Sequence, residues 1–318
     1  MTLFQDLIKE DPKQRDELQK QLLLKIQQHS RRKTISYLAN FKNSPHNMIN
    51  NEDKSAVEIL INSLSPQTKM VDFILHSPGG FAEDTEMVVT ILRNRFDNIR
   101  FIIPHSAMSA ATMLALSGDE ILMFAFSQLG PVDPQISGPT SGPAQSIIDG
   151  FEEIKKEVEK SGKLNGAYVP LLNKMDVATI KFCENSIKYG KTNVKKWLRW
   201  YMLQGLEAKK RRGVAAKIGN YFSNQGKHLT HRRPIFRKEA KAQGVVIQDI
   251  EEDKIFAEMI KKYYYRWEML FNAPTSVTKV FQSESEFIVK HAPVVFISNP
   301  VRVPQPPRPK KQQKRENG

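Results

Sequence analysis

The stretch MVDFILHSPGGFAEDTEMVVTILRNRFDNIRFIIPHSAMSAATMLALSGDEILMFA, residues 70–125, decides the fold because it alternates short apolar runs with helix-like runs. Three apolar runs bounded by turn residues predict buried strands, at 70–77, 99–104 and 120–125. Two segments between them predict helices, at 81–96 and 109–118. Near-continuous apolar strands that alternate with helices are typical of a parallel sheet covered on both faces.

The same alternation continues on both sides of this stretch. Upstream, TISYLANF predicts a strand at 34–41, and apolar spacing predicts helices at about 4–30 and 52–64. Downstream, a loop rich in Gly, Pro and Ser precedes a helical region, a late strand and a further helix, at 127–146, 147–225, 244–250 and 253–271. The helical region has an expected interruption at 161–170. The sequence therefore predicts an α/β fold with a largely parallel sheet and added helices at both ends.

Four segments are expected along the chain. The first is an amino-terminal helix that packs on the core or on another subunit, and the second is the α/β core, which includes a basic helical region. The third is a carboxyl-terminal helical extension, and the fourth is a basic, Pro-rich tail that we expect to be disordered. Their bounds are 1–33, 34–250 (basic region 188–241), 251–295 and 296–318.

Composition narrows the class of protein. Of 318 residues, 40% are hydrophobic and 26% are charged, which is typical of a soluble globular chain. We find no apolar run of about 18 residues that could span a bilayer, and the first residues lack the apolar core of a secretion signal. The single cysteine, Cys183, excludes an internal disulfide and a thiolate metal cluster. We therefore expect a cytoplasmic protein without a metal or an organic cofactor.

The net charge of +14 is concentrated in one region. Between residues 188 and 241 sixteen Lys or Arg residues face two acids, Glu207 and Glu239. Such a region could attract nucleic acid or an acidic partner. A solvated helical face is the alternative explanation.

Ser77-Pro78-Gly79-Gly80 follows one predicted strand and precedes a helix. Adjacent glycines let the backbone approach a ligand closely, and the start of a helix leaves N–H groups free for an anion. These features suit an oxyanion hole, whose donors are fixed before charge develops. A tight strand-to-helix turn without a ligand is the alternative.

Ser109 opens a small-residue helix after the next strand, within Met108-Ser109-Ala110-Ala111. Its hydroxyl is expected near the positive end of that helix, and the Ala110 N–H could be a second oxyanion donor. A helix-capping serine is the alternative. Because consecutive βα units of a parallel sheet place their turns at one edge, we expect Ser109 to lie near Gly79 and Gly80.

HSPGG, AMSAAT and SQLGPVDPQ, in this order and spacing, resemble the serine dehydrogenase proteinase family, a branch of Clp-fold serine peptidases related to signal peptide peptidase A. GKHLTHRRPI, residues 226–235, resembles the later signature of that family. The likeness covers roughly residues 34–250. It implies a Clp-protease/crotonase-like core of repeated ββα and βα units, Ser109 as the nucleophile, and an oxyanion hole made by Gly79 or Gly80 with the Ala110 amide.

This chain also departs from the family pattern at two places. Ala110 and Ala111 stand where family members usually have glycines, which narrows the approach to Ser109. Arg232 and Arg233 replace the usual Asp-Tyr after the histidine. Both changes could alter the substrate or the rate.

The general base has three candidates. A serine hydroxyl needs a His, or a Lys whose pKa is lowered by burial, within hydrogen-bond reach. The resemblance to signal peptide peptidases favours a lysine, and Lys174 is our first candidate because its apolar surroundings could bury it. Lys163 and His231 are the second and third. We expect Asp133 to orient a loop or close a subunit contact rather than to act as the acid of a triad.

The leading hypothesis is a serine peptidase with a Ser109–Lys174 dyad, acting on peptide or protein substrates. The resemblance also implies self-assembly into a homo-oligomer. One alternative is a catalytically silent Clp-fold scaffold that binds nucleic acid or an acidic partner through the basic region. Another is a crotonase-like enzyme that holds a thioester enolate and would need coenzyme A.

Overall fold

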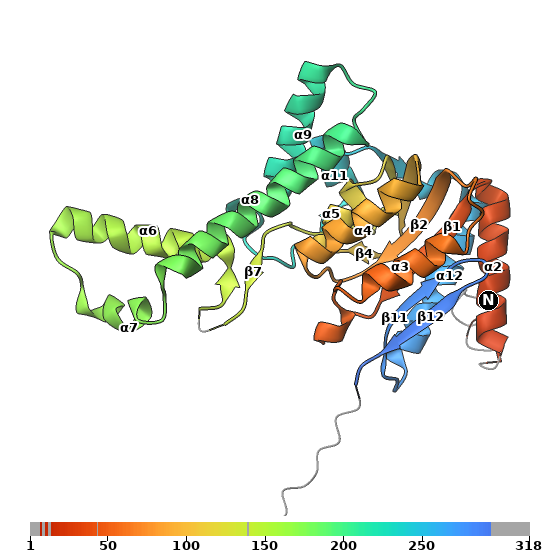
Figure 1. Cartoon of the computed structure of the whole chain (residues 1–318), viewed down its shortest axis with the longest axis horizontal. Coiled ribbons are helices and arrows are strands. Elements are labelled where there is room, and N and C mark those ends of the chain that lie inside the picture. Colours follow the sequence, from red (N-terminus) through yellow and green to blue (C-terminus); the bar gives the residue numbers. More distant parts are fainter. Residues whose placement is uncertain (1–6, 8–9, 12–13, 43, 139, 294–318) are drawn as a thin grey trace, which may run out of the picture.

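A computed structural model of the chain describes residue 7 and residues 10–11, 14–42, 44–138 and 140–293 (Figure 1). The central feature is a seven-stranded sheet with the order β10-β5-β3-β2-β1-β11-β12. Its strands are β1 (Lys33–Ala39), β2 (Met70–His76), β3 (Asn98–Ile103), β5 (Glu120–Met123), β10 (Ile247–Asp249), β11 (Val277–Gln282) and β12 (Phe287–His291). The five strands from β10 to β1 are parallel, whereas β11 and β12 are antiparallel to their neighbours.

Helices cover both faces of this sheet, as the apolar strands predict. One face packs against α3 (Asp53–Asn62), α4 (Ala82–Arg95), α5 (Ala110–Leu116), α8 (Val177–Trp200) and α9 (Ala208–Phe222). The other face packs against α2 (Arg15–Ser30) and α12 (Lys254–Asn272). Successive strand residues alternate between the two cores, so Phe73 lies in the first core and Ile74 in the second. The predicted α/β class with a largely parallel sheet is confirmed.

Shorter elements complete the fold. A three-stranded sheet contains β4 (Ser106–Ala107), β6 (Gln128–Leu129) and β9 (Ile235–Phe236), and a two-stranded one contains β7 (Gln135–Ile136) and β8 (Gly142–Pro143). The remaining helices are α6 (Ala144–Ser161), α7 (Val169–Leu172), α10 (Gln225–His228) and α11 (Arg237–Gln243), with 3-10 turns η2 (Pro45–Asn47), η3 (Gly166–Tyr168) and η4 (Ile250–Glu252). The helical region is interrupted after α6, as predicted.

An arm projects from the body of the molecule (Figure 1). It consists of α6, η3, α7 and the first half of α8, and it extends to one side of the sheet. Its own small core contains Ala144, Ile147 and Cys183. The arm therefore has few apolar contacts with the main cores.

Both ends of the described chain differ from simple helical additions. The segment 251–295, predicted as helical, also contains β11 and β12, which extend the main sheet beyond β1. This correction has a physical reason, since Val277, Val280 and Phe281 place apolar side chains against the two cores from a strand. At the other end α2 packs against α12 and β1. The predicted disordered tail, 296–318, lies outside the described residues.

Candidate active site

Ser109 lies in a strained turn between β4 and α5. Its backbone has φ 51° and ψ −121°, and it immediately precedes the first residue of α5. A positive φ is costly for a residue with a side chain, so the surrounding structure must impose it. A serine in a sharp strand-to-helix turn of this kind exposes its hydroxyl, as in the nucleophile elbow of hydrolases. Among the described residues no hydrogen-bond partner of the Ser109 hydroxyl is found, and the residue is partly exposed.

Hydrogen bonds from neighbouring segments hold this turn. The Ser77 N–H donates to the Ser106 carbonyl at 3.0 Å, and the Met108 N–H donates to the Ser77 carbonyl at 3.0 Å. On the other side, the Thr112 hydroxyl donates to the Ala107 carbonyl at 2.6 Å and accepts from the Gly130 N–H at 2.9 Å. The turn is thus fixed from both flanks before any substrate binds.

Gly79 lies directly against Ser109. Its φ is +100°, and a Cβ at this position would lie 2.5 Å from the Met108 carbonyl oxygen and 2.7 Å from the Ser109 Cβ. Only glycine fits here. The expected proximity of the Gly-Gly turn and Ser109 is therefore present in the structure.

Only some of the backbone N–H groups at this turn donate to an acceptor among the described residues. The Gly79 N–H donates to the Ser77 hydroxyl oxygen at 3.2 Å. Within the described residues no acceptor is found for the Gly80 or Ala110 N–H. Because an oxyanion needs unused donors, Gly80 and Ala110 suit that role better than Gly79.

The three-stranded sheet brings two further side chains to the end where Ser109 lies. β4 runs parallel to β6, with Ala107 opposite Leu129, and β6 is antiparallel to β9, with Leu129 opposite Ile235. The residues that follow β4 and β6, and those that precede β9, therefore leave the sheet at one end. Asp133 and His231 belong to these last two segments.

His231 and Asp133 form a paired unit. The His231 Nδ1 lies 2.8 Å from the Asp133 Oδ1, and the Asp133 side chain is only 3% exposed. The Gln135 amide donates to the other carboxylate oxygen at 2.8 Å. An ionised carboxylate only accepts hydrogen bonds, so Nδ1 carries the proton and the Nε2 lone pair can accept another. This arrangement is that of an oriented general base.

The pairing with His231 is a contact that the sequence analysis did not predict for Asp133, which was expected to orient a loop or close a subunit contact. Sequence reasoning missed it because 98 residues separate the two side chains. The signals that could have found it are the GPVDP loop after one short strand and the histidine before another.

The two lysine candidates lie on the arm. Lys174 lies between α7 and α8 and is exposed, so the expected burial of its side chain is wrong. Its apolar neighbours do not enclose it, because the arm is thin at this point and packs on little besides itself. Lys163, after α6, is also exposed. In the described part of the chain no hydrogen bond or ion pair joins either ammonium group to the Ser109 turn.

His76, the last residue of β2, has a structural environment. His76 is buried and stacks on Phe41 with a centroid separation of 4.5 Å. Burial and, to a smaller extent, the neighbouring His105 lower the pKa of His76 to about 3. The Nδ1 of His76 accepts the Ser106 N–H at 3.2 Å. His76 is therefore neutral, and this hydrogen bond attaches it to Ser106 of β4.

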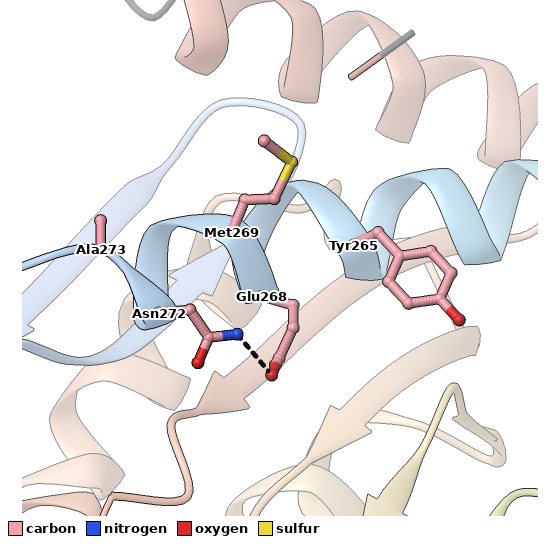
Figure 2. A pocket seen from close by; sticks show the side chains of 5 residues that line it. All are labelled: Tyr265, Glu268, Met269, Asn272 and Ala273. Carbon is pink, nitrogen blue, oxygen red and sulfur yellow. Dashed lines mark hydrogen bonds between the residues drawn. The ribbon is translucent and has the colours of Figure 1, made fainter. Parts of the chain in front are cut away.

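One surface hollow lies apart from these residues (Figure 2). It has a volume of about 330 Å³ and lies along α12, and its lining consists of Tyr265, Glu268, Met269, Asn272 and Ala273. The Asn272 amide donates to the Glu268 carboxylate at 3.0 Å. None of the candidate catalytic residues lines this hollow.

The described residues contain no group of three or more His, Cys, Asp or Glu side chains that could hold a metal ion. They also contain no helix with the length and hydropathy needed to cross a membrane.

The mostly parallel sheet, its helical layers and the serine turn define an α/β protein of the Clp-protease/crotonase class. The family model of ClpP-like SDH-type serine proteinases matches residues 26–264, and the chain belongs to this family. The predicted resemblance is thus confirmed.

Individual relatives cover less of the chain. The uncharacterized proteins MJ1495 and MJ0137 of Methanocaldococcus jannaschii are 40% and 38% identical over 88 and 89 residues. Those segments are 28% of this chain, and they span 29% and 30% of the two relatives.

Two solved structures, both of point mutants, are also similar. A ClpP1 mutant from Listeria monocytogenes has a TM-score of 0.38 and 12% identity, covering 73% of this chain and 98% of its own. A mutant of 1510-N, a membrane-bound stomatin-specific protease, has a TM-score of 0.28 and 18% identity, covering 48% of this chain and 80% of its own.

Proposed function

We propose that this chain is a serine peptidase in which Ser109 is the nucleophile and His231 is the general base. The observation that carries the proposal is the 2.8 Å contact between His231 Nδ1 and buried Asp133 at the end of the small sheet where Ser109 lies. Membership of a serine proteinase family supports the same chemistry. Asp133 positions the imidazole, and Gly80 and Ala110 donate to the oxyanion.

The reaction proceeds in two halves. The Ser109 Oγ attacks the carbonyl carbon of a peptide bond while its proton passes to His231 Nε2. The carbonyl oxygen becomes an oxyanion and accepts hydrogen bonds from the Gly80 and Ala110 amides. The C–N bond then breaks, and His231 gives its proton to the leaving amine. Water repeats the sequence on the acyl-enzyme and releases the carboxylic acid.

The Ser109–Lys174 dyad and its Lys163 variant stay predictions that the same assay tests. A lysine becomes a general base where burial disfavours its charged form, so either of these exposed residues would need a further burial step to act. A neighbouring copy of the chain could provide such burial. We rank both lysines below His231 because His231 already has an orienting carboxylate.

The decisive experiment digests an unfolded protein such as casein and reads the fragments by mass spectrometry. We expect cleavage by the wild type and none by Ser109→Ala. His231→Gln should lower kcat by about 10³-fold or more, whereas Lys174→Met and Lys163→Met should retain activity. If only a lysine variant lost activity, that lysine and not His231 would be the general base. Equal cleavage by wild type and Ser109→Ala would point to a contaminant and reject Ser109.

The competing hypotheses predict other outcomes. A silent scaffold shows no cleavage by any variant, and family membership does not favour it. A crotonase-like enzyme would bind coenzyme A thioesters, and dependence on Ser109 would be absent. We also propose that the substrates are peptides or proteins and that the protein is cytoplasmic. The fragments from the casein digestion would give the sequence preference.

A second candidate function rests on the charge of α8 and α9. Of the sixteen basic residues between 188 and 241, a segment described throughout, ion pairs involve only Lys196, Arg233 and Arg237. Lys191, Lys195 and Arg199 lie one turn apart on α8 and are half-buried. Burial, with Lys191 and Arg199 nearby, lowers the pKa of Lys195.

Half-buried cations without an anion are unfavourable, so a bound polyanion would stabilise this surface. We propose that it binds nucleic acid through phosphate contacts. Fluorescence anisotropy with a labelled single-stranded oligonucleotide should show binding that weakens with salt and is lost when Lys191, Lys195 and Arg199 are changed to Gln. The matched control changes Lys155, Lys156 and Lys160 on α6. Binding of an acidic peptide but no oligonucleotide would reassign the partner, and equal loss in the control would reject this surface.

A further inference from the structure

A buried ion pair is connected to the Gly79–Gly80 turn through neighbouring residues. The Lys279 Nζ of β11 lies 2.8 and 2.9 Å from the two carboxylate oxygens of Asp53, in the first turn of α3. The Lys279 side chain is 1% exposed and that of Asp53 is fully buried. Charged side chains are almost never buried this completely unless they are paired. Removing one partner of such a pair leaves the other charge uncompensated.

One branch of hydrogen bonds runs from this pair to the turn. The Tyr37 hydroxyl donates to the Asp53 Oδ2 at 2.9 Å, and the Ser77 side chain lies close to the Tyr37 hydroxyl. The Ser77 hydroxyl oxygen accepts the Gly79 N–H at 3.2 Å. Since Tyr37 donates to Asp53, Ser77 can donate to Tyr37 and still accept from Gly79. In this arrangement the Tyr37 hydroxyl, the Ser77 hydroxyl and the Gly79 N–H would each have an acceptor.

A second branch reaches the other side of the turn. The Asp53 Oδ2 also accepts the Asn50 N–H at 3.1 Å. The preceding residue, Ile49, donates its N–H to the Gly79 carbonyl at 2.7 Å and accepts the Phe81 N–H at 3.0 Å. Asp53 thus fixes the turn through the Gly79 N–H on one side, and through the Gly79 carbonyl and Phe81 on the other.

The amide of Gly80 lies between these two attachments. An oxyanion donor stabilises the transition state only if it is aimed before charge develops, so movement of the turn costs catalysis without weakening ground-state binding equally. Loss of Lys279 would remove the two closest cation contacts of the buried Asp53 carboxylate and leave only Lys290, whose Nζ lies 3.6 Å from Oδ1. The carboxylate would then be held less firmly, which weakens both branches.

We propose that Lys279 is a positioning residue that holds the oxyanion turn through Asp53, an inference that rests on the proposed peptidase function. Lys279 belongs to the β11–β12 hairpin, which lies beyond the family-matched residues 26–264. The hairpin therefore contributes to the active site of this chain as well as extending its sheet.

The test compares Lys279→Met with Val280→Ala in the full chain. Val280 is the next residue of β11, is fully buried and lies in the opposite core, so its truncation weakens the hairpin without touching Asp53. Both variants should lower the Tm. Well below the lower Tm, Lys279→Met should reduce kcat by about tenfold or more with KM within about twofold, whereas Val280→Ala should leave both unchanged.

A second readout does not depend on activity. Hydrogen–deuterium exchange of the peptide covering residues 76–81 should be faster in Lys279→Met than in the wild type, and unchanged in Val280→Ala. If the wild type lacks peptidase activity, the proposed function fails, and the exchange comparison still tests whether Lys279 holds the turn. Equal exchange in both variants, or equal kcat, would overturn the inference. Should Lys279→Met not fold, Ser77→Ala, which cuts the first branch alone, is expected to give the same faster exchange.

Discussion

At the scale of single residues, the absence of a side chain at position 79 lets the candidate oxyanion turn lie directly against Ser109. Gly79→Ala would place a Cβ 2.5 Å from the Met108 carbonyl oxygen at a φ of +100°. We expect peptidase activity to fall by about 10²-fold or more, because a shift of about 1 Å in a reacting group has that effect. Casein digestion measures it. Gly150→Ala, on open surface of α6, is the control and should keep full activity.

Buried His76 predicts the direction in which pH affects stability. Its folded pKa of about 3 lies below the ordinary value of 6.5, so the unfolded chain binds a proton that the folded chain refuses. Its contribution is fully present above pH 6.5 and is lost as the pH falls toward 3. The slope should approach about 1.4 kcal/mol per pH unit. Urea unfolding at about pH 7, 6, 5 and 4 should show a shallower loss in His76→Asn, and no such change in His46→Asn, whose side chain is exposed.

At the scale of elements, two adjacent leucines of helix α2 differ in burial and should therefore differ in their effect on stability. Leu23 is fully buried against α12, whereas Leu24, the next residue, is 41% exposed. Leu23→Ala should lower the free energy of unfolding by about 3 kcal/mol, and Leu24→Ala by less than about 1 kcal/mol. Chemical denaturation measures both values. Similar small effects would mean that α2 contacts another subunit instead of the core.

The sequence predicted the elements whose periodicity is local and missed what depends on distant partners. The apolar runs of β2, β3 and β5 and the helices between them were found because neighbouring residues define them. The hairpin of β11 and β12 was missed, since Lys279 at a buried strand position is acceptable only with Asp53, 226 residues away. Likewise Ser109 was predicted as the nucleophile from its own turn, but the pairing of His231 with Asp133 has no local pattern.

At the scale of the whole molecule, the arm exposes apolar side chains that the body does not cover. Val177 at the start of α8 is 83% exposed and Phe182 is 59% exposed. Leu164, Val169 and Leu171 of the arm are exposed as well. Several exposed apolar residues on one projecting segment are typical of an interaction surface, and the family resemblance implies self-assembly. We therefore propose that the arm contacts a second copy of the chain.

Phe182→Asp should then lower the mass of the assembly in light scattering, because a buried carboxylate without a cation opposes association. Ile255→Asp is the matched control, since Ile255 is 66% exposed at the start of α12 on the body, and it should keep the wild-type mass. Both variants should keep the wild-type Tm of the protomer, because neither side chain supports a core. An unchanged mass in Phe182→Asp, or a monomeric wild type, would reject the arm as the contact. If Phe182→Asp both dissociates the assembly and abolishes cleavage, the active site depends on assembly. An exposed lysine of the arm, Lys163 or Lys174, would then be a candidate general base for Ser109 of a neighbouring copy.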